Sequence, residues 1–211
     1  MLPKGHYTGI GSRKTPEPIL ELMVDLGYAL HQQGWILRSG GADGADRAFQ
    51  DGATAHPFSD FIPREIYLPW NHFNGLSHQV ENGIYDTTLF KNRHFAQQAI
   101  QPLIPYWDQL KSTHQNLYIR NAYQVLGYSL KRPTQLVICW APPTKDGGVE
   151  GGTGVAVRLA QKHNIPIINL YYEAEVERAK NTIRKAGTPK SFELPEYDQT
   201  SIQEFYKIVR T

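Results

Sequence analysis

The chain has 211 residues, of which 40% are hydrophobic and 20% charged, with a formal net charge of +2. A chain of this length can bury a core without disulfides or metals, and its net charge is too small to argue for nucleic acid binding by itself. It has no apolar stretch of about 18 residues, so we expect no membrane span.

Strand and helix patterns alternate over the first third of the chain. In order, the sequence predicts a strand at residues 6–11, a helix at 19–33, a strand at 35–38, a helix at 45–54 and a strand at 65–68. The first helix is indicated by apolar residues at helical spacing, with prolines before it and Gly34 after it. Such alternation at short intervals indicates βαβ units and a parallel sheet.

The pattern is interrupted over residues 70–115 and then returns. The sequence predicts a helix at residues 92–99 within this insertion, then a helix at 116–130, a strand at 135–141, a helix at 155–163, a strand at 166–171 and a C-terminal extension over 172–211 with helices at 174–186 and 201–209. We therefore predict one α/β domain over residues 1–211, with a Rossmann-like parallel sheet of about five strands and helices on both faces.

The insertion is rich in aromatic residues and histidines. One interpretation makes the aromatic side chains the core of a helical cover on the sheet, and another makes the insertion a lid whose rings stack on a base. Both can hold, because a cover over the carboxyl edge would also close a pocket. The histidines show no metal-ligand spacing, so no metal is expected. The single cysteine, Cys139, excludes an internal disulfide, and we expect it to be a buried core residue of a cytoplasmic protein.

Three glycine-rich turns follow predicted strands, at residues 9–13, 39–44 and 151–154. In a parallel sheet, such turns lie together at the carboxyl edge of the strands, where ligands bind. Glycine lets the backbone approach a phosphate, and the first N–H groups of the following helix bind anions. Ser12 and Ser39 add hydroxyl donors, and Arg13 adds a guanidinium suited to phosphate. None of the turns matches the phosphate loop of ATPases or the dinucleotide fingerprint, so no such cofactor is expected.

The order of four motifs resembles the SLOG superfamily of Rossmann-like proteins, which includes DprA/Smf and the LOG-type nucleotide phosphoribohydrolases. The motifs are Gly11-Ser12-Arg13, the turn at residues 39–46, the pair Arg120-Asn121, and the turn at residues 151–154. The resemblance is closest to DprA-like members, and it covers residues 7–170 except for the insertion. Members are often dimers, so the resemblance also implies a homo-oligomer.

The resemblance implies a pocket lined by thirteen residues of the four motifs, and Gly151 of the third turn is a further candidate. They are Gly11, Ser12, Arg13, Ser39, Gly40, Gly41, Asp43, Asp46, Arg120, Asn121, Gly152, Thr153 and Gly154. Arg13 and Arg120 would neutralise phosphate, and Asp43 or Asp46 would cap the second helix or hold a sugar hydroxyl. Two structural alternatives stay open: Asp46 as a residue that only stabilises a helix start, and Arg120 as a surface residue.

The sequence departs from the LOG-type motif at the position of the catalytic glutamate. LOG-type hydrolases use a glutamate four residues after the last glycine of their motif, and this chain has Arg158 there. The candidate catalytic carboxylates that remain are Glu150, just before the turn, Asp43 and Asp86, which lowers the expectation of LOG-type hydrolysis.

Three functions follow, in order of preference. The first is binding of a nucleotide or a nucleotide-derived phosphate ligand, the second is hydrolysis of a nucleotide N-glycosidic bond, and the third is DprA-like binding of single-stranded DNA. The third needs a basic track flanked by aromatic residues, for which the sequence offers Lys14, Arg38, Lys91, Arg93, Lys131 and Arg132.

Overall fold

The computed structural model describes residues 4–55, 64–145 and 148–186. Six strands form one sheet in the order β4-β3-β2-β1-β5-β6, and every neighbouring pair is parallel. The strands are β1 (Gly5–Gly11), β2 (Trp35–Ser39), β3 (Arg64–Leu68), β4 (Ile84–Asp86), β5 (Leu136–Trp140) and β6 (Ile167–Asn169). The α-helices are α1 (Glu17–Gln32), α2 (Ala45–Thr54), α3 (Arg93–Ile100), α4 (Ser112–Leu126), α5 (Gly151–Lys162) and α6 (Glu173–Ala186).

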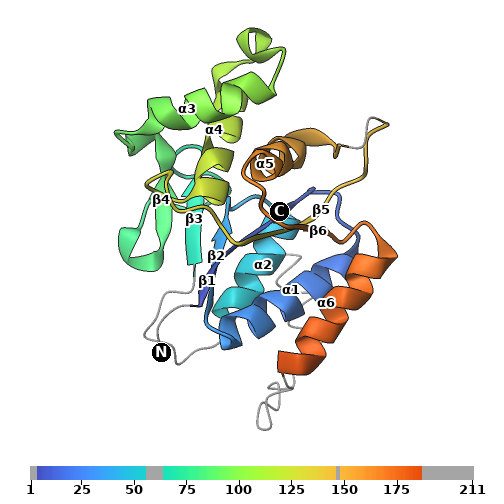
Figure 1. The fold of residues 1–211 in the computed structure, drawn as a ribbon. Coiled ribbons are helices and arrows are strands. Elements are labelled where there is room, and N and C mark those ends of the chain that lie inside the picture. The colour runs from blue at the N-terminus through green and yellow to red at the C-terminus, as the bar shows by residue number, and fades with distance from the viewer. Residues whose placement is uncertain (1–3, 56–63, 146–147, 187–211) are drawn as a thin grey trace, which may run out of the picture.

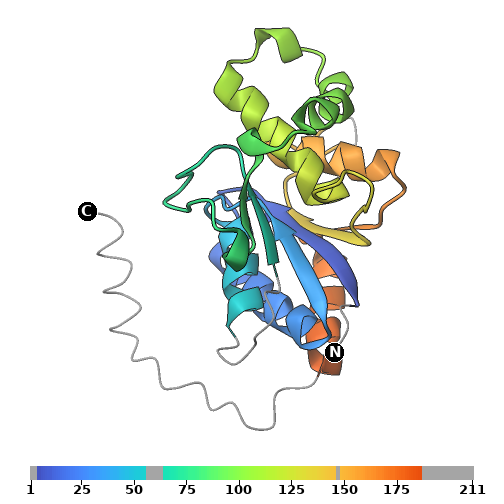
Figure 2. The same cartoon turned by 90° about the vertical axis from the view of Figure 1, so that its left-hand side faces the viewer.

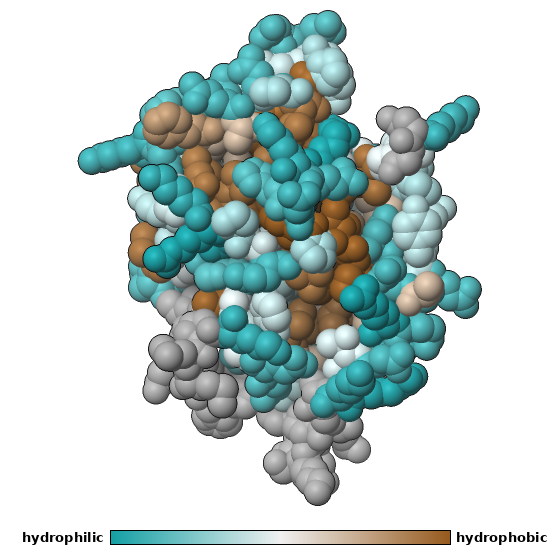
Figure 3. All heavy atoms as spheres, viewed as in Figure 1, coloured by the Kyte–Doolittle hydropathy of each residue, from teal (hydrophilic) through white to brown (hydrophobic). Residues whose placement is uncertain are grey.

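The helices cover both faces of the sheet. Helices α1, α2 and α6 lie on one face and α3, α4 and α5 on the other (Figures 1 and 2). Strand β5 is apolar on both sides because it is covered twice: Val137 and Cys139 pack into the core with α4 and α5, and Ile138 packs into the core with α1 and α2. Figure 3 shows hydrophobic residues gathered in the middle of the face seen in Figure 1, with hydrophilic residues around them. The α/β, Rossmann-like fold class is confirmed.

Three elements differ in detail from the sequence-based expectation. Strand β4 lies in the insertion and was not predicted, since three residues carry no periodicity, but it pairs with β3 from Ile84 to Asp86. Helix α4 starts four residues earlier than predicted and ends at Leu126, before Gly127, whose φ is 74°. Helix α5 begins at Gly151, so the third glycine turn is the first turn of the helix. The helix expected at residues 201–209 lies outside the described residues.

Aromatic residues of the insertion belong to the core in part. Phe90 and Trp107 are buried with α3, α4 and α5, whereas Phe95 and Tyr106 are exposed. Phe90 packs edge-on against Tyr123 of α4, with ring centroids 4.9 Å apart. The insertion is thus packed on the sheet through these rings. No described helix has the length and apolar character needed to cross a bilayer.

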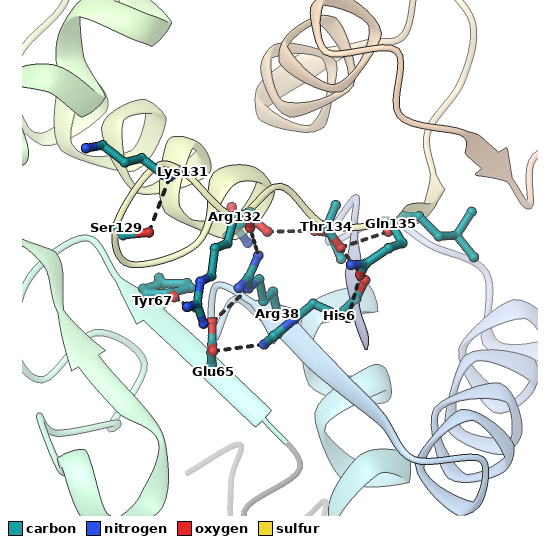
Figure 4. Close-up of polar contacts among 12 residues, drawn as sticks. His6, Arg38, Glu65, Tyr67, Ser129, Lys131, Arg132, Thr134 and Gln135 are labelled. Atoms are coloured by element: carbon teal, nitrogen blue, oxygen red, sulfur yellow. Dashed lines mark hydrogen bonds and ion pairs between the residues drawn. The ribbon is translucent and has the colours of Figure 1, made fainter. Parts of the chain in front are cut away.

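A polar network ties the first three strands to the loop after α4 (Figure 4). Glu65 of β3 accepts hydrogen bonds from Arg38 Nε at 2.7 Å and from the Tyr67 hydroxyl at 2.7 Å, and its other oxygen lies 3.2 Å from His6 Nε2. Arg38 also donates to the backbone oxygen of Arg132 at 2.6 Å. Arg38 is therefore buried and paired, so its expected contribution to an exposed DNA track is wrong.

Candidate functional site

A cavity of about 500 Å³ opens at the carboxyl ends of β1 and β5. These strands are neighbours in the sheet, but the chain leaves β1 toward β2 and leaves β5 toward β6, on the opposite side. This reversal makes the position the topological switch point of the sheet, where ligands of such folds bind. The cavity is lined by the turn after β1, the end of β5 and the following loop, one face of α4 and the first turn of α5.

The turn after β1 brings two cations to the cavity, and neither has a carboxylate partner among the described residues. The Ser12 N–H donates to the Trp140 oxygen at 3.1 Å, which ties the turn to β5, and the Ser12 hydroxyl accepts from the Lys14 N–H at 3.0 Å. Arg13 and Lys14 are exposed, and no ion pair engages either of them within the described ranges. Gly11 is required here, because a Cβ would lie 2.6 Å from the Ala45 Cβ.

Asp46 and Arg120 form a buried pair at the inner side of the cavity. Arg120 Nη1 lies 3.7 Å from the Asp46 Oδ2 and donates to the Gly40 oxygen. The same Asp46 oxygen accepts from the N–H groups of Gly40 at 3.1 Å and of Ala42 at 3.4 Å. Burial raises the pKa of Asp46, although Arg120 and these N–H groups act in the opposite direction, and burial lowers the pKa of Arg120.

This arrangement decides between the structural alternatives for two residues. Asp46 holds the turn after β2 in place rather than only stabilising the start of α2, and Arg120 is 9% exposed, so it is not a surface residue. The positive charge of Arg120 is largely matched by Asp46. We infer that an anion in the cavity would be attracted mainly by Arg13 and Lys14.

Helix α4 forms one wall of the cavity, and its lining residues become more buried along the helix. His114, Leu117, Asn121 and Gln124 all line the cavity at helical spacing, and their exposure falls along the helix from an exposed His114 to 1% for Gln124. The Asn121 amide donates to the Gly152 oxygen at 3.0 Å and so links α4 to the first turn of α5. The Gln124 side chain has no hydrogen-bond partner on either amide atom among the described residues.

The first turn of α5 lies at the cavity. Glu150 is the N-cap residue, and its side chain makes no capping hydrogen bond. The N–H groups of the first helical residues have no acceptor within a helix, and Gly151, Gly152 and Thr153 line the cavity. Gly154 allows the turn, because a Cβ there would overlap the Val149 oxygen. Helix starts of this kind are positions at which anions bind in proteins.

Ten of the sixteen expected site residues line this cavity. They are Gly11, Ser12, Arg13, Asp46, Arg120, Asn121, Glu150, Gly151, Gly152 and Thr153. The other six do not line it: Ser39, Gly40, Gly41, Asp43, Asp86 and Gly154.

The turn after β2 has structural partners instead. The Ser39 hydroxyl donates to the Gly9 oxygen at 2.7 Å, and the Gly41 oxygen accepts from Asn74 at 3.1 Å.

Sequence reasoning missed several lining residues. Phe73, Leu117, Tyr118, Gln124 and Trp140 line the cavity but were not assigned to a site. A usable signal was the spacing of Leu117, Asn121 and Gln124, which places them on the helix face of the Arg120-Asn121 motif. Phe73 gave no such signal, because it reaches the cavity from an irregular loop.

The described residues give no support for a reactive cysteine or for a metal site. Cys139 is fully buried, and burial raises the pKa of its thiol to about 12, so the protein holds it as an inert thiol. Within the described residues, no group of three or more His, Cys, Asp and Glu side chains is arranged to hold a metal ion.

Fold and cavity together define an α/β, Rossmann-like protein with a ligand-sized cavity at its switch point. No protein-family model matches the chain, and no curated protein matches it in sequence. Two solved structures are similar. DNA processing protein A from Helicobacter pylori, described by its single-stranded DNA binding mode, is 17% identical with a TM-score of 0.51 over 87% of this chain and 80% of that one.

The second is the Moco carrier protein of Chlamydomonas rheinhardtii, which is 18% identical with a TM-score of 0.46 over 88% of this chain and 86% of that one. At such identities the likeness is one of fold. The expected resemblance to DprA-like proteins is confirmed at this level by the Helicobacter pylori protein.

Proposed function

We propose that the protein binds a nucleotide or a nucleotide-derived phosphate ligand in the cavity at the β1–β5 switch point. The observation that carries the proposal is the meeting of two kinds of anion-binding group at one cavity. The exposed cations Arg13 and Lys14 follow β1, and the free N–H groups of Gly152 and Thr153 begin α5. A phosphate between them would accept hydrogen bonds from both.

The remaining walls suit a planar ring. Ile10, Leu117, Tyr118 and Trp140 supply apolar and aromatic surface beside the polar groups. A cavity of about 500 Å³ falls within the range of about 300–1,000 Å³ typical of small-ligand sites. A mononucleotide has the two parts that these walls require, an anion and an aromatic ring.

The proposal is tested by calorimetric titration with AMP, GMP, CMP and UMP. We expect at least one nucleotide to bind, with an affinity that falls as salt is raised, because Arg13 and Lys14 are exposed to screening. Arg13→Ala should weaken binding by about three- to tenfold, the loss of one charge-assisted contact at an exposed site.

Lys162→Ala is the matched control, since it removes a cation from the far end of α5 and should leave affinity unchanged. Absence of binding by all four nucleotides, or equal effects of the two substitutions, would contradict the proposal.

Single-stranded DNA is a second candidate ligand. It is favoured by the fold shared with the Helicobacter pylori protein and by an exposed aromatic residue between lysines: Tyr128 is 58% exposed and packs on Phe90, and Lys91 and Lys131 are exposed beside it. Stacking on an aromatic side chain between cations is typical of such binding. Salt-dependent retention of an oligothymidylate that is weakened by Tyr128→Ala, with no mononucleotide binding, would favour this candidate.

Hydrolysis of the bound nucleotide depends on one carboxylate. Glu150 lines the cavity and is exposed, whereas Asp43 and Asp86 do not line it. Release of free base from a nucleoside monophosphate, abolished by Glu150→Gln with binding retained, would establish this activity. Binding without release would leave the protein a binder.

A further inference from the structure

The Gln124 side chain is an unexplained polar group in the cavity wall. It is 1% exposed, and within the described residues neither its amide nitrogen nor its amide oxygen has a hydrogen-bond partner. A buried polar group left unpaired destabilises the protein, so such groups are rare and usually have a reason. Because Gln124 lines the ligand-sized cavity, a ligand bound there is the candidate partner for its amide.

Neighbouring groups fix the backbone at Gln124 and leave its side-chain amide unbonded among the described residues. The Gln124 backbone oxygen accepts from the Thr8 hydroxyl at 2.6 Å, which anchors α4 to β1. The Gln124 amide nitrogen lies close to Gly40, where a Cβ would come within 2.6 Å of it. Arg120, one turn earlier, is occupied by Asp46 and Gly40 and leaves Gln124 without a partner. The terminal torsion of glutamine is broad, so the amide can rotate toward a ligand while α4 stays in place.

We propose that Gln124 recognises the base of the bound nucleotide. A primary amide offers a donor and an acceptor side by side, and its complement is an edge with an adjacent acceptor and donor. Adenine, guanine, cytosine and uracil all carry such an edge on a planar ring, and ribose 5-phosphate has no base. This inference rests on the proposed function and extends it: the ligand enters with its base toward Gln124 and its phosphate toward Arg13 and α5.

The side chains between these two ends fit this orientation. Leu117 and Tyr118 of α4 lie between the exposed His114 and the buried Gln124 along the cavity wall. Phe73 also lines the cavity and lies 5.8 Å from the guanidinium of Arg120, as a ring over a cation. The base therefore has apolar surface beside it and one amide at its edge, the usual composition of a specific small-ligand site.

The test compares nucleotides with ribose 5-phosphate by calorimetry. In the wild-type protein, we expect the best nucleotide to bind at least about tenfold tighter than ribose 5-phosphate. Gln124→Met keeps the length of the side chain and removes the amide. It should weaken nucleotide binding at least about tenfold, because the donor and the acceptor of the amide are both lost from a buried site, and leave ribose 5-phosphate binding unchanged.

Thermal unfolding of the same variant without ligand separates recognition from a structural role. If Gln124 is unpaired in the free protein, Gln124→Met removes an unsatisfied group, and Tm should stay the same or rise. A fall in Tm with unchanged nucleotide affinity would identify Gln124 as a structural residue and overturn the inference.

Gln50→Met is the matched control. Gln50 is a buried glutamine of α2 whose amide oxygen has no partner within the described part of the chain, but it does not line the cavity. This substitution should leave the preference for nucleotide over ribose 5-phosphate unchanged, and an equal loss in both variants would overturn the inference.

A measurement on the wild-type protein does not depend on any variant. The side-chain amide resonances of Gln124 should shift on addition of the tightest-binding nucleotide and stay in place on addition of ribose 5-phosphate. Equal binding of nucleotides and ribose 5-phosphate would overturn the inference while leaving the proposed function intact. Absence of binding by every compound would remove both.

Discussion

At the scale of single residues, the Glu65 carboxylate illustrates how this protein tolerates charge inside its fold. Burial alone would raise the pKa of Glu65, but the hydrogen bond from His6, the charge of Arg38 and the hydrogen bond from Tyr67 outweigh burial and lower it to about 2. The carboxylate bridges β1, β2 and β3 through these partners. A buried ion in such a network is costly to leave without one of its partners.

The depressed pKa of Glu65 predicts a defined loss of stability in acid. Relative to its ordinary value of 4.5, the pKa of about 2 corresponds to about 3 kcal/mol of unfolding free energy. This contribution is complete above about pH 5 and is lost as the pH falls toward 2, because the unfolded chain takes up the proton first. In Glu65→Gln, the deficit relative to wild type should therefore be about 3 kcal/mol at pH 7 and shrink in acid, as measured by urea denaturation.

The exposed residue Glu81 provides the control for that titration. Glu81→Gln should leave the pH dependence unchanged, because this side chain is exposed on the surface. Parallel pH profiles for wild type and Glu65→Gln would contradict the role of the network.

At the scale of elements, the turn between β2 and α2 and the second half of α4 are built as one unit. Gly40 donates to Asp46 of α2 and accepts from Arg120 of α4. The turn was expected to contact ligand directly. Only Ala42 of the turn lines the cavity, and Gly40 lies behind the cavity wall, where it holds Arg120 in position.

Gly40→Ala is predicted to be strongly destabilising. A Cβ at this position would overlap the Arg120 guanidinium, and neither Arg120 nor the turn can move without breaking the pair with Asp46. Overpacking of this kind costs about 1–3 kcal/mol, and the displaced ion pair adds to that. The free energy of unfolding measures the effect.

Gly152→Ala is the control for that stability measurement. A Cβ at Gly152 would meet only Tyr118, at an ordinary contact distance of 3.8 Å. Equal stability of the two variants would show that the space around Gly40 is not restrictive.

At the scale of the whole molecule, the sequence predicted the sheet and the place of the site better than the partners within it. In a parallel sheet, the turns that follow the strands all lie at the carboxyl edge of the sheet. It was therefore predictable from the sequence that Gly11 and Gly152 lie at the same edge. The partner of Arg120 was not predictable, because pairing with Asp46 depends on where α2 and α4, which cover opposite faces of the sheet, place these two side chains at its carboxyl edge. Strand β4 and Phe73 were missed for a related reason: they lie in an irregular segment without periodicity.

Cys139 offers a reporter of the whole fold. It lies in β5, between β1 and β6, with its thiol fully buried. We expect a disulfide reagent to modify it only when the sheet opens, so that the rate of modification follows the population of opened molecules. A nucleotide at about 100 times its Kd should slow modification about 100-fold, which corresponds to about 2.7 kcal/mol of added stability.

Modification of the urea-unfolded chain is the control for this reporter, and nucleotide should not alter it. Rapid modification of the native protein, or a rate indifferent to a nucleotide that binds, would contradict the expected coupling between site and fold.

The alignment of Gly11 beside Trp140 has a consequence for biosynthesis. The two residues are adjacent in space, yet the chain completes four strands before it returns to the first one with β5. A nascent chain on the ribosome thus carries one half of the site long before the other half has been translated. The ligand therefore cannot assist the early steps of folding. It can bind only to molecules in which β5 has already paired with β1.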